Sequence, residues 1–128
     1  MIEPIFLTVD ELLLIHKIQI EEFGGVHGLR DSALLESAMM QPMATIDGIY
    51  LHPSLFDQAA AYVFHLCQNH PFLDGNKRAA LAGGLVFLEI NGIEILDPSG
   101  SLYEMVMKVA RGVYGKKETA EILRGLSR

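Results

Sequence analysis

Cysteine, positive charge and long apolar runs are all scarce in this sequence. Cys67 is the only cysteine, which excludes an intrachain disulfide. We expect it to be an inert packed thiol in a reducing compartment. Ten lysines and arginines stand against 16 aspartates and glutamates, a formal net charge of -6 that would repel a phosphate backbone. Nucleic acid is therefore not expected as a direct partner.

No stretch reaches the roughly 18 apolar residues from which a membrane-spanning helix is inferred. The opening residues, Met1 to Phe6, also lack the basic start and apolar segment of a secretory signal. We therefore expect a soluble cytoplasmic protein with no membrane partner. The chain has 128 residues, 50% of them hydrophobic, which is enough for one packed core. This predicts a single domain over residues 1–128.

Apolar residues recur at helical intervals along most of the chain, which predicts an all-α protein. A capping box formed by Thr8 and Glu11 opens the first helix, and Gly24 ends it. We expect His16 on the polar side of this helix. Its predicted buried face comprises Leu12, Ile15 and Ile18.

The later helices are predicted from caps and stops. Asp31 or Ser32 caps the second helix, and Pro53 lies in the first turn of the third. A fourth covers about 76–91, and Gly83-Gly84 within it predicts a close approach of the third helix. A capping box at Ser101 opens a fifth helix, and a sixth covers about 117–126. The predicted inward face of the fifth comprises Met105, Val106, Val109 and Val113. The expected architecture is a single compact bundle of about six helices.

A short polar loop between the third and fourth predicted helices carries the groups most useful for chemistry. His70 is the kind of side chain that exchanges a proton at neutral pH. Asp74 offers a hard anionic oxygen suited to Mg²⁺. Phe72 between them is expected to point into the core and fix the shape of the loop.

The next residues begin a helix and are suited to binding an anion. Gly75, Asn76 and Lys77 lie where the first N–H groups of a helix have no internal partners. Lys77 and Arg78 add two positive charges at the same end, and the side-chain amide of Asn76 is expected to orient phosphate. Each residue alone has a structural explanation, such as a turn at Asp74-Gly75. Their combination favours a phosphate site.

A zinc site is the weaker alternative for this region. His65, Cys67 and His70 are close in sequence, but residues two apart on a helix point to different faces. No second cluster of ligands accompanies them. We therefore expect no zinc here.

The loop resembles the signature of the Fic/Doc family. Its residues read His70-x-Phe72-x-Asp74-Gly75-Asn76-Lys77-Arg78, against the family form H-x-F-x-[D/E]-G-N-[G/K]-R. AMP-transferring Fic enzymes continue as G-N-G-R-x-x-R, and this sequence has Lys77 and Leu81 in place of the second glycine and second arginine. Both departures are those of the Doc branch, the toxin half of addiction modules. The resemblance covers nearly the whole chain.

The resemblance implies an ATP-dependent enzyme with an all-α Fic/Doc fold. His70 and Asp74 would be catalytic, with Asp74 also holding Mg²⁺, and residues 75–78 would bind the nucleotide phosphates. Lys77 and Leu81 favour transfer of the γ-phosphate to a Ser or Thr hydroxyl of a protein target, which for the Doc branch is elongation factor Tu, so that translation stops. AMP transfer in the Fic manner stays open as an alternative. So does a non-catalytic homologue whose task is to bind an antitoxin.

The family also implies partners and contact surfaces. Doc-like toxins are silenced by a small Phd-like antitoxin whose C-terminal segment folds into an apolar groove. No inhibitory S/T-x-x-x-E-[G/N] helix is evident in the chain, so inhibition is expected from another polypeptide. Met43 to His52 is expected to be a surface connection near the active loop that contacts the target. Gly28 to Asp31 also matches a pattern of Doc-like sequences, which we interpret mainly as packing.

Overall fold

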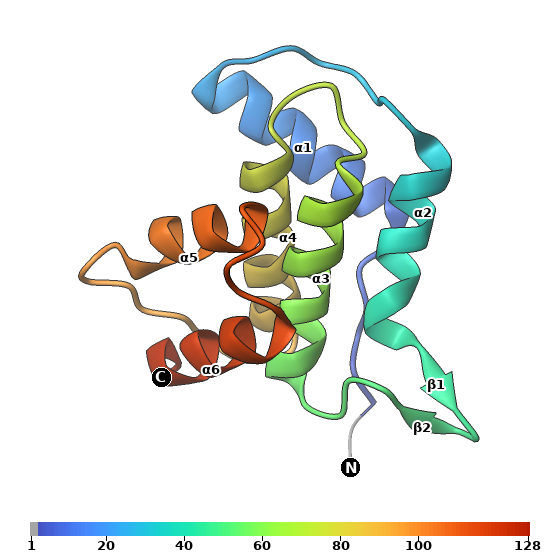
Figure 1. The fold of residues 1–128 in the computed structure, drawn as a ribbon, viewed down its shortest axis with the longest axis vertical. Coiled ribbons are helices and arrows are strands. Elements are labelled where there is room, and N and C mark those ends of the chain that lie inside the picture. Colours follow the sequence, from blue (N-terminus) through green and yellow to red (C-terminus); the bar gives the residue numbers. More distant parts are fainter. Residues whose placement is uncertain (1–2) are drawn as a thin grey trace.

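The computed structural model describes residues 3–128 and shows six α-helices and one short hairpin in that part of the chain (Figure 1). Met1 and Ile2, the start of the stretch compared with a secretory signal, lie outside the described residues. In chain order the elements are α1 (Val9–Phe23), α2 (Ser32–Met40), the 3-10 turn η1 (Gln41–Met43), β1 (Thr45–Ile46), β2 (Ile49–Tyr50), α3 (Leu55–Asn69), α4 (Asn76–Ile90), α5 (Ser101–Ala110) and α6 (Lys116–Leu126). The predicted all-α bundle of about six helices is confirmed. Among the described residues, no helix is both long and apolar enough to cross a bilayer.

Helices α3 and α4 form the centre of the bundle and pack side by side (Figure 1). Gly84 lets them come close, because a Cβ there would lie 2.7 Å from Val63 Cγ2 and 3.3 Å from the Ala59 carbonyl oxygen. The predicted close approach is confirmed for Gly84, whereas Gly83 has Leu12 Cδ1 of α1 as its nearest neighbour. Since α3 and α4 are antiparallel, the end of α3 lies beside the start of α4.

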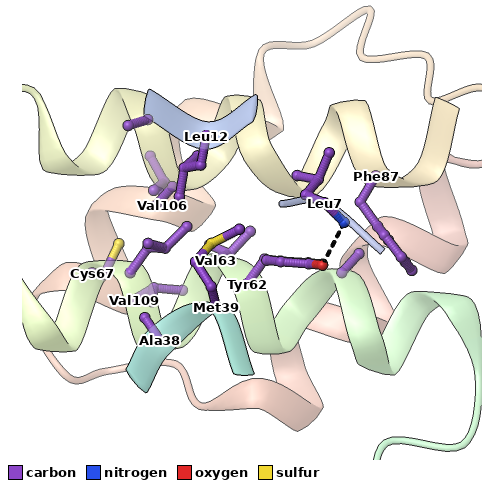
Figure 2. Packing of buried hydrophobic residues seen from close by; sticks show 14 of the residues in the cluster. Leu7, Leu12, Ala38, Met39, Tyr62, Val63, Cys67, Phe87, Val106 and Val109 are labelled. Carbon is purple, nitrogen blue, oxygen red and sulfur yellow. Dashed lines mark hydrogen bonds between the residues drawn. The ribbon is translucent and has the colours of Figure 1, made fainter. Parts of the chain in front are cut away.

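The core lies between this central pair and the surrounding helices (Figure 2). Tyr62 is fully buried, and its hydroxyl oxygen accepts a hydrogen bond from the Leu7 N–H at 2.9 Å (Figure 2). Burial raises the pKa of Tyr62 to about 12, so the hydroxyl stays neutral. Cys67 is also buried, and burial raises the pKa of its thiol to about 12. The thiol is therefore packed and protonated, in agreement with its prediction.

Side-chain caps fix the starts of the first three helices. The predicted capping box at Thr8 is confirmed for α1, and Asp31 caps α2 by accepting the Leu34 N–H. Ser54 caps α3, so Pro53 lies just outside the helix and not in its first turn as predicted. These caps satisfy N–H groups that would otherwise have no partner.

The start of helix α5 differs from the predicted one. The carboxylate of Asp97 accepts hydrogen bonds from the N–H groups of Ser101 at 2.7 Å and Leu102 at 3.0 Å. The predicted capping box at Ser101 is wrong, because an acidic side chain four residues earlier already binds these N–H groups. Val113 was expected to face inward, but it lies beyond the end of α5 and is exposed.

The β1–β2 hairpin lies at the opposite end of α3 from the polar loop (Figure 1). The two strands pair antiparallel, with Thr45 opposite Tyr50, and the Tyr50 hydroxyl donates a hydrogen bond to Glu3 at 2.8 Å. The prediction that Met43 to His52 lies near the loop is therefore wrong. The reason is that α2 and α3 run in opposite directions, so their connection falls at the far end of the bundle.

Two histidines surround Lys116, the first residue of α6. The Lys116 ammonium lies 3.2 Å from Nε2 of His52 and 3.2 Å from Nε2 of His65. An ammonium can only donate, so both Nε2 atoms act as acceptors. Burial, and then the charge of Lys116, lowers the pKa of His65 from 6.5 to about 4. The same two causes lower the pKa of His52, against weaker opposing effects of Gln41 and Asp57.

We expect the protein to lose stability as the pH falls from about 6.5 towards 4. Over this range the unfolded chain binds a proton at His65 and the folded chain does not, so acid favours unfolding. Because the imidazole is only half-buried and partly screened, its share of the loss between pH 7 and pH 5 should be about 1 kcal/mol. Denaturant unfolding at the two pH values measures this loss.

The variant His65→Gln tests the origin of this pH dependence. It should show a smaller difference between pH 7 and pH 5 than the wild type, because the proton-binding group is gone. His27→Gln, at an exposed histidine between α1 and α2, is the matched control. An undiminished difference in His65→Gln would show that another group is responsible.

Candidate active site

The polar loop lies where the end of α3 meets the start of α4 (Figure 1). His70 ends α3 in a left-handed conformation with a φ of 50°, and Gly75 precedes α4 with a φ of 76°. A pocket of about 220 Å³ opens at this junction. Its lining residues are His70, Leu73, Asp74, Gly75, Asn76, Lys77 and Arg78. All six residues predicted to be catalytic or phosphate-binding therefore line one pocket.

A larger hollow lies elsewhere on the surface but carries different chemistry. It measures about 560 Å³ and is lined by residues near the end of α4, including Leu85, Glu89 and Glu94. Its lining contains no histidine and no cation, and its two carboxylates would repel a phosphate. The smaller pocket at the polar loop is therefore the better candidate for an active site.

Phe72 and Asn76 hold the loop together from inside. Phe72 is only 1% exposed. The Asn76 side chain is also buried; its Oδ1 accepts the Phe72 N–H at 2.9 Å and its Nδ2 donates to the Phe72 carbonyl oxygen at 3.0 Å. This amide thus closes a ring within the loop. That the Asn76 side chain also orients phosphate stays a prediction. The main-chain N–H of Asn76, at the start of α4, is better placed for this role than the side chain.

The Asp74 carboxylate is held by two main-chain donors. Its Oδ2 accepts the Val26 N–H at 3.1 Å and its Oδ1 accepts the Gly75 N–H at 2.8 Å. These two hydrogen bonds, followed by the nearby charges of Arg78 and His16, lower the pKa of Asp74 below its usual value. The group is therefore ionised at neutral pH. One lone pair on each oxygen remains available to a cation.

Helix α4 starts without a side-chain cap, unlike α1, α2 and α3. Its N-cap is Gly75, so the N–H groups of Asn76, Lys77 and Arg78 have neither an internal acceptor nor a capping side chain. The ion pairs found within residues 3–128 involve neither Lys77 nor Arg78. Arg78 instead donates weakly to the Gln19 carbonyl oxygen at 3.4 Å. Two cationic side chains and the uncapped N-terminus of α4 therefore meet at the pocket. This arrangement favours the binding of an anion.

A segment far away in the sequence clamps the outside of the loop. Arg30 Nε donates to the His70 carbonyl oxygen at 2.7 Å, and its Nη2 donates to the Asn69 carbonyl oxygen at 2.9 Å. The Leu73 N–H donates to the Gly28 carbonyl oxygen at 3.0 Å. A guanidinium at the end of α3 satisfies carbonyl groups that have no helical partner. The Gly28–Asp31 pattern therefore packs against the main chain of residues that line the pocket.

His16 is buried beneath the loop, and its predicted position on the polar side of α1 is wrong. The side chain is 5% exposed, and its ring stacks on that of Phe72. The buried face of α1 consists of Leu12, His16 and Ile20, whereas Ile18 is 45% exposed. Counting in fours from Leu12 gives the observed buried face, whereas counting in threes gives the predicted one. Helical periodicity permits both faces. Only the position of the loop decides between them.

The described residues offer no independent metal centre. No group of three or more His, Cys, Asp or Glu side chains within residues 3–128 could hold a metal. A Mg²⁺ ion with one protein carboxylate is nevertheless common where substrate phosphates supply further ligands. The free lone pairs of Asp74 fit this mode of binding. The site is thus suited to a magnesium ion that arrives with a nucleotide.

Comparison with known proteins decides the family. The model of the Fic/DOC family matches residues 6–88, more than half of the chain. The chain belongs to the Fic/DOC family. It is 30% identical to Protein kinase doc of Escherichia phage P1 over 120 residues, 94% of each chain. It is 45% identical to Toxin Doc of Mycolicibacterium smegmatis over 73 residues, which are 57% of this chain and 56% of that protein. The family predicted from the loop is confirmed.

The part of this Fic/DOC chain that matches the family model contains the whole pocket. Residues 6–88 also include the clamp at Gly28–Asp31 and His16, both of which contact the loop. Helices α5 and α6 lie beyond the matched residues. The contacts that shape the candidate site therefore all come from the portion of the chain that defines the family.

Proposed function

We propose that this Fic/DOC protein is a Doc-type toxin that transfers the γ-phosphate of ATP to a Ser or Thr hydroxyl of a protein target. The observation that carries the proposal is the pocket of about 220 Å³ in which a histidine, an ionised aspartate and an uncapped helix start meet two cations. Relatives named Toxin Doc and Protein kinase doc support it. A phosphate chain that carries Mg²⁺ would suit these groups together, because the metal ion would offset the repulsion between the phosphates and the aspartate.

The phosphates of ATP would lie against the first turn of α4. The N–H groups at the start of this helix and the side chains of Lys77 and Arg78 would then face the charge that develops during transfer. Asp74 would hold Mg²⁺, which would neutralise part of the phosphate charge when it is bound. The donors need no rearrangement, because the loop that carries them is already fixed by Phe72 and Asn76.

His70 would act as the general base. Its exposed side chain lines the pocket, so it can take the proton from the attacking hydroxyl. The hydroxyl oxygen then forms a bond to the γ-phosphorus, the bond from that phosphorus to the β-phosphate oxygen breaks, and ADP leaves. The imidazolium later returns its proton to solvent. The Arg30 guanidinium holds the main chain at His70 and supports this placement.

Lys77 and Leu81 are the features that favour γ-transfer over AMP transfer. The long side chain of Lys77 occupies space that a glycine would leave free for an α-phosphate. Leu81 is partly buried and packs against the core, so this position provides no cation to hold the outer phosphates. Both features favour a nucleotide that binds in the opposite direction to that in AMP-transferring Fic enzymes, so that its γ-phosphate is next to His70.

ATP labelled separately at the α and γ positions tests the proposal. We expect purified protein with Mg²⁺ and elongation factor Tu to place the γ-label on the target and to release ADP. Label from the α position on the target would instead identify an AMP transferase. Labelling by neither would favour a non-catalytic homologue that only binds an antitoxin. Asp74→Asn keeps the shape of the side chain but removes its charge and one of the two hydrogen bonds that it accepts from the main chain, so it should lower γ-label transfer.

The proposed biological setting is a toxin–antitoxin module in the cytoplasm. We propose elongation factor Tu as the target and a Phd-like antitoxin as the partner, since both follow from the Doc branch that the loop resembles. Modification of this factor would stop translation. The relative named Toxin Doc supports the toxin assignment. Translation in a cell-free extract should stop when the protein and ATP are added. In a second reaction that contains the antitoxin from the start, translation should continue.

A further inference from the structure

His16 connects α1 to the polar loop without lining the pocket. Its ring lies parallel to that of Phe72, with the ring centroids 3.7 Å apart and the planes inclined by 4°. Such a face-to-face contact buries both rings and restricts the rotation of each. Since Phe72 anchors the loop, α1 supports this anchor from behind.

The same imidazole also fixes the main chain at Asp74. Its Nε2 lies 2.8 Å from the Asp74 carbonyl oxygen. A carbonyl oxygen only accepts, so Nε2 carries the hydrogen and donates. This hydrogen bond sets the plane of the peptide between Asp74 and Gly75. A Cβ at Gly75 would lie 3.6 Å from Nε2, which shows how closely the ring fits beneath the start of α4.

We propose that His16 is a positioning residue for phosphate transfer. The peptide that it orients carries the Asp74 carboxylate on one side and the Gly75 N–H, which that carboxylate accepts at 2.8 Å, on the other. A rotation of this peptide would move the metal-binding oxygen and the first N–H groups of α4 together. His16 thus controls the geometry of both parts of the phosphate site from beneath it. This inference rests on the proposed function and adds a residue to it.

A purely structural role for His16 predicts something different. If the side chain only fills space, any residue of similar volume should preserve activity as far as it preserves folding. If the donor positions the loop, activity should follow the presence of the hydrogen bond at equal stability. The two roles are therefore separable by variants that differ only in the donor.

The variants His16→Gln and His16→Met provide this comparison. Glutamine and methionine have similar length and volume and neither has a ring, but only glutamine can donate to the Asp74 carbonyl oxygen. We expect His16→Met to reduce kcat by about 10- to 100-fold with little change in KM for the protein target. His16→Gln should recover most of that loss, while the two variants melt at similar temperatures. Equal kcat values in the two variants would overturn the inference.

His16→Phe keeps the test valid if loss of the ring prevents folding. Phenylalanine can still stack on Phe72 but cannot donate to Asp74. We expect this variant to fold and to lose activity as His16→Met does. Transfer at the wild-type rate by folded His16→Phe would overturn the inference.

A readout without catalysis separates this inference from the proposed function. In two-dimensional amide NMR spectra, the signals of Gly75, Asn76 and Lys77 should move further from their wild-type positions in His16→Met than in His16→Gln. Equal positions in the two variants would overturn the positioning role even if the wild type transfers phosphate. A wild type that transfers neither label, with these signals displaced as expected, would refute the proposed function alone.

Discussion

His70→Ala is expected to lower γ-phosphate transfer by about 10²- to 10⁴-fold while the helix bundle stays folded. The side chain is exposed and lines the pocket, so its removal deletes the proposed proton acceptor without opening a cavity in the core. The main chain at this position is left-handed, with a φ of 50°. Histidine already carries a Cβ in this conformation and tolerates it only somewhat better than alanine, so the substitution should cost less than about 1 kcal/mol of stability. Labelled-ATP transfer, together with circular dichroism, measures both effects.

His70→Asn separates the lost proton acceptor from the backbone strain. Asparagine tolerates left-handed backbone better than alanine, so this variant should be more stable than His70→Ala and equally inactive. His27→Ala is the matched control, because it removes an exposed imidazole from the segment next to the loop and should keep activity. Transfer by His70→Asn at the rate of the wild type would remove His70 from the role of general base.

The residues that line the pocket could be predicted because they are contiguous. His70, Asp74 and the residues up to Arg78 lie within nine positions, and an apolar helical pattern on each side fixes where the loop falls. A helix start immediately after a glycine also predicts unpaired N–H groups from local geometry alone. The groups that line the candidate site could therefore be predicted from one short stretch, without the packing around it.

The residues that hold this loop from outside could not be predicted in the same way. His16 contacts Asp74 across 58 positions, and Arg30 contacts His70 across 40. The prediction placed His16 on the polar side of α1 because imidazole is a polar group. The sequence pattern contained no sign that the ring of Phe72 would stack on it. Only the packing of α1 across α4 brings the two rings together. Contacts of this kind depend on tertiary structure.

Competition between nearby polar groups explains another wrong prediction. At the start of α5, both Ser101 and Asp97 can accept helix N–H groups, and the sequence pattern alone favoured the capping box at Ser101. The Asp97 carboxylate takes two of these N–H groups instead, because an ionised acceptor forms the stronger hydrogen bond. The position of the hairpin was wrong for a different reason, since it depends on the relative direction of α2 and α3.

Phe72→Ala is expected to have the largest effect on stability. Phe72 is 1% exposed and contacts the His16 ring face to face. Truncation of a buried phenylalanine costs about 3–5 kcal/mol, through lost apolar burial and the cavity that is left. For a protein of this size, that corresponds to a fall in Tm of roughly 10–20 °C. Denaturant unfolding and thermal melting measure the loss. Leu73→Ala is the matched control for stability, because its neighbouring side chain is 55% exposed, and it should change stability by less than about 0.5 kcal/mol.

Phe72→Leu shows whether this anchor serves the chemistry as well as the fold. Leucine keeps most of the buried volume, so its cost in stability should be about 1–1.5 kcal/mol. It cannot stack on His16, however, and the loop should lose the support that aligns Asp74 and the start of α4. We therefore expect transfer to fall by about tenfold or more at a temperature where the variant is fully folded. A folded Phe72→Leu protein with wild-type transfer would mean that Phe72 stabilises the bundle without setting the geometry of the site.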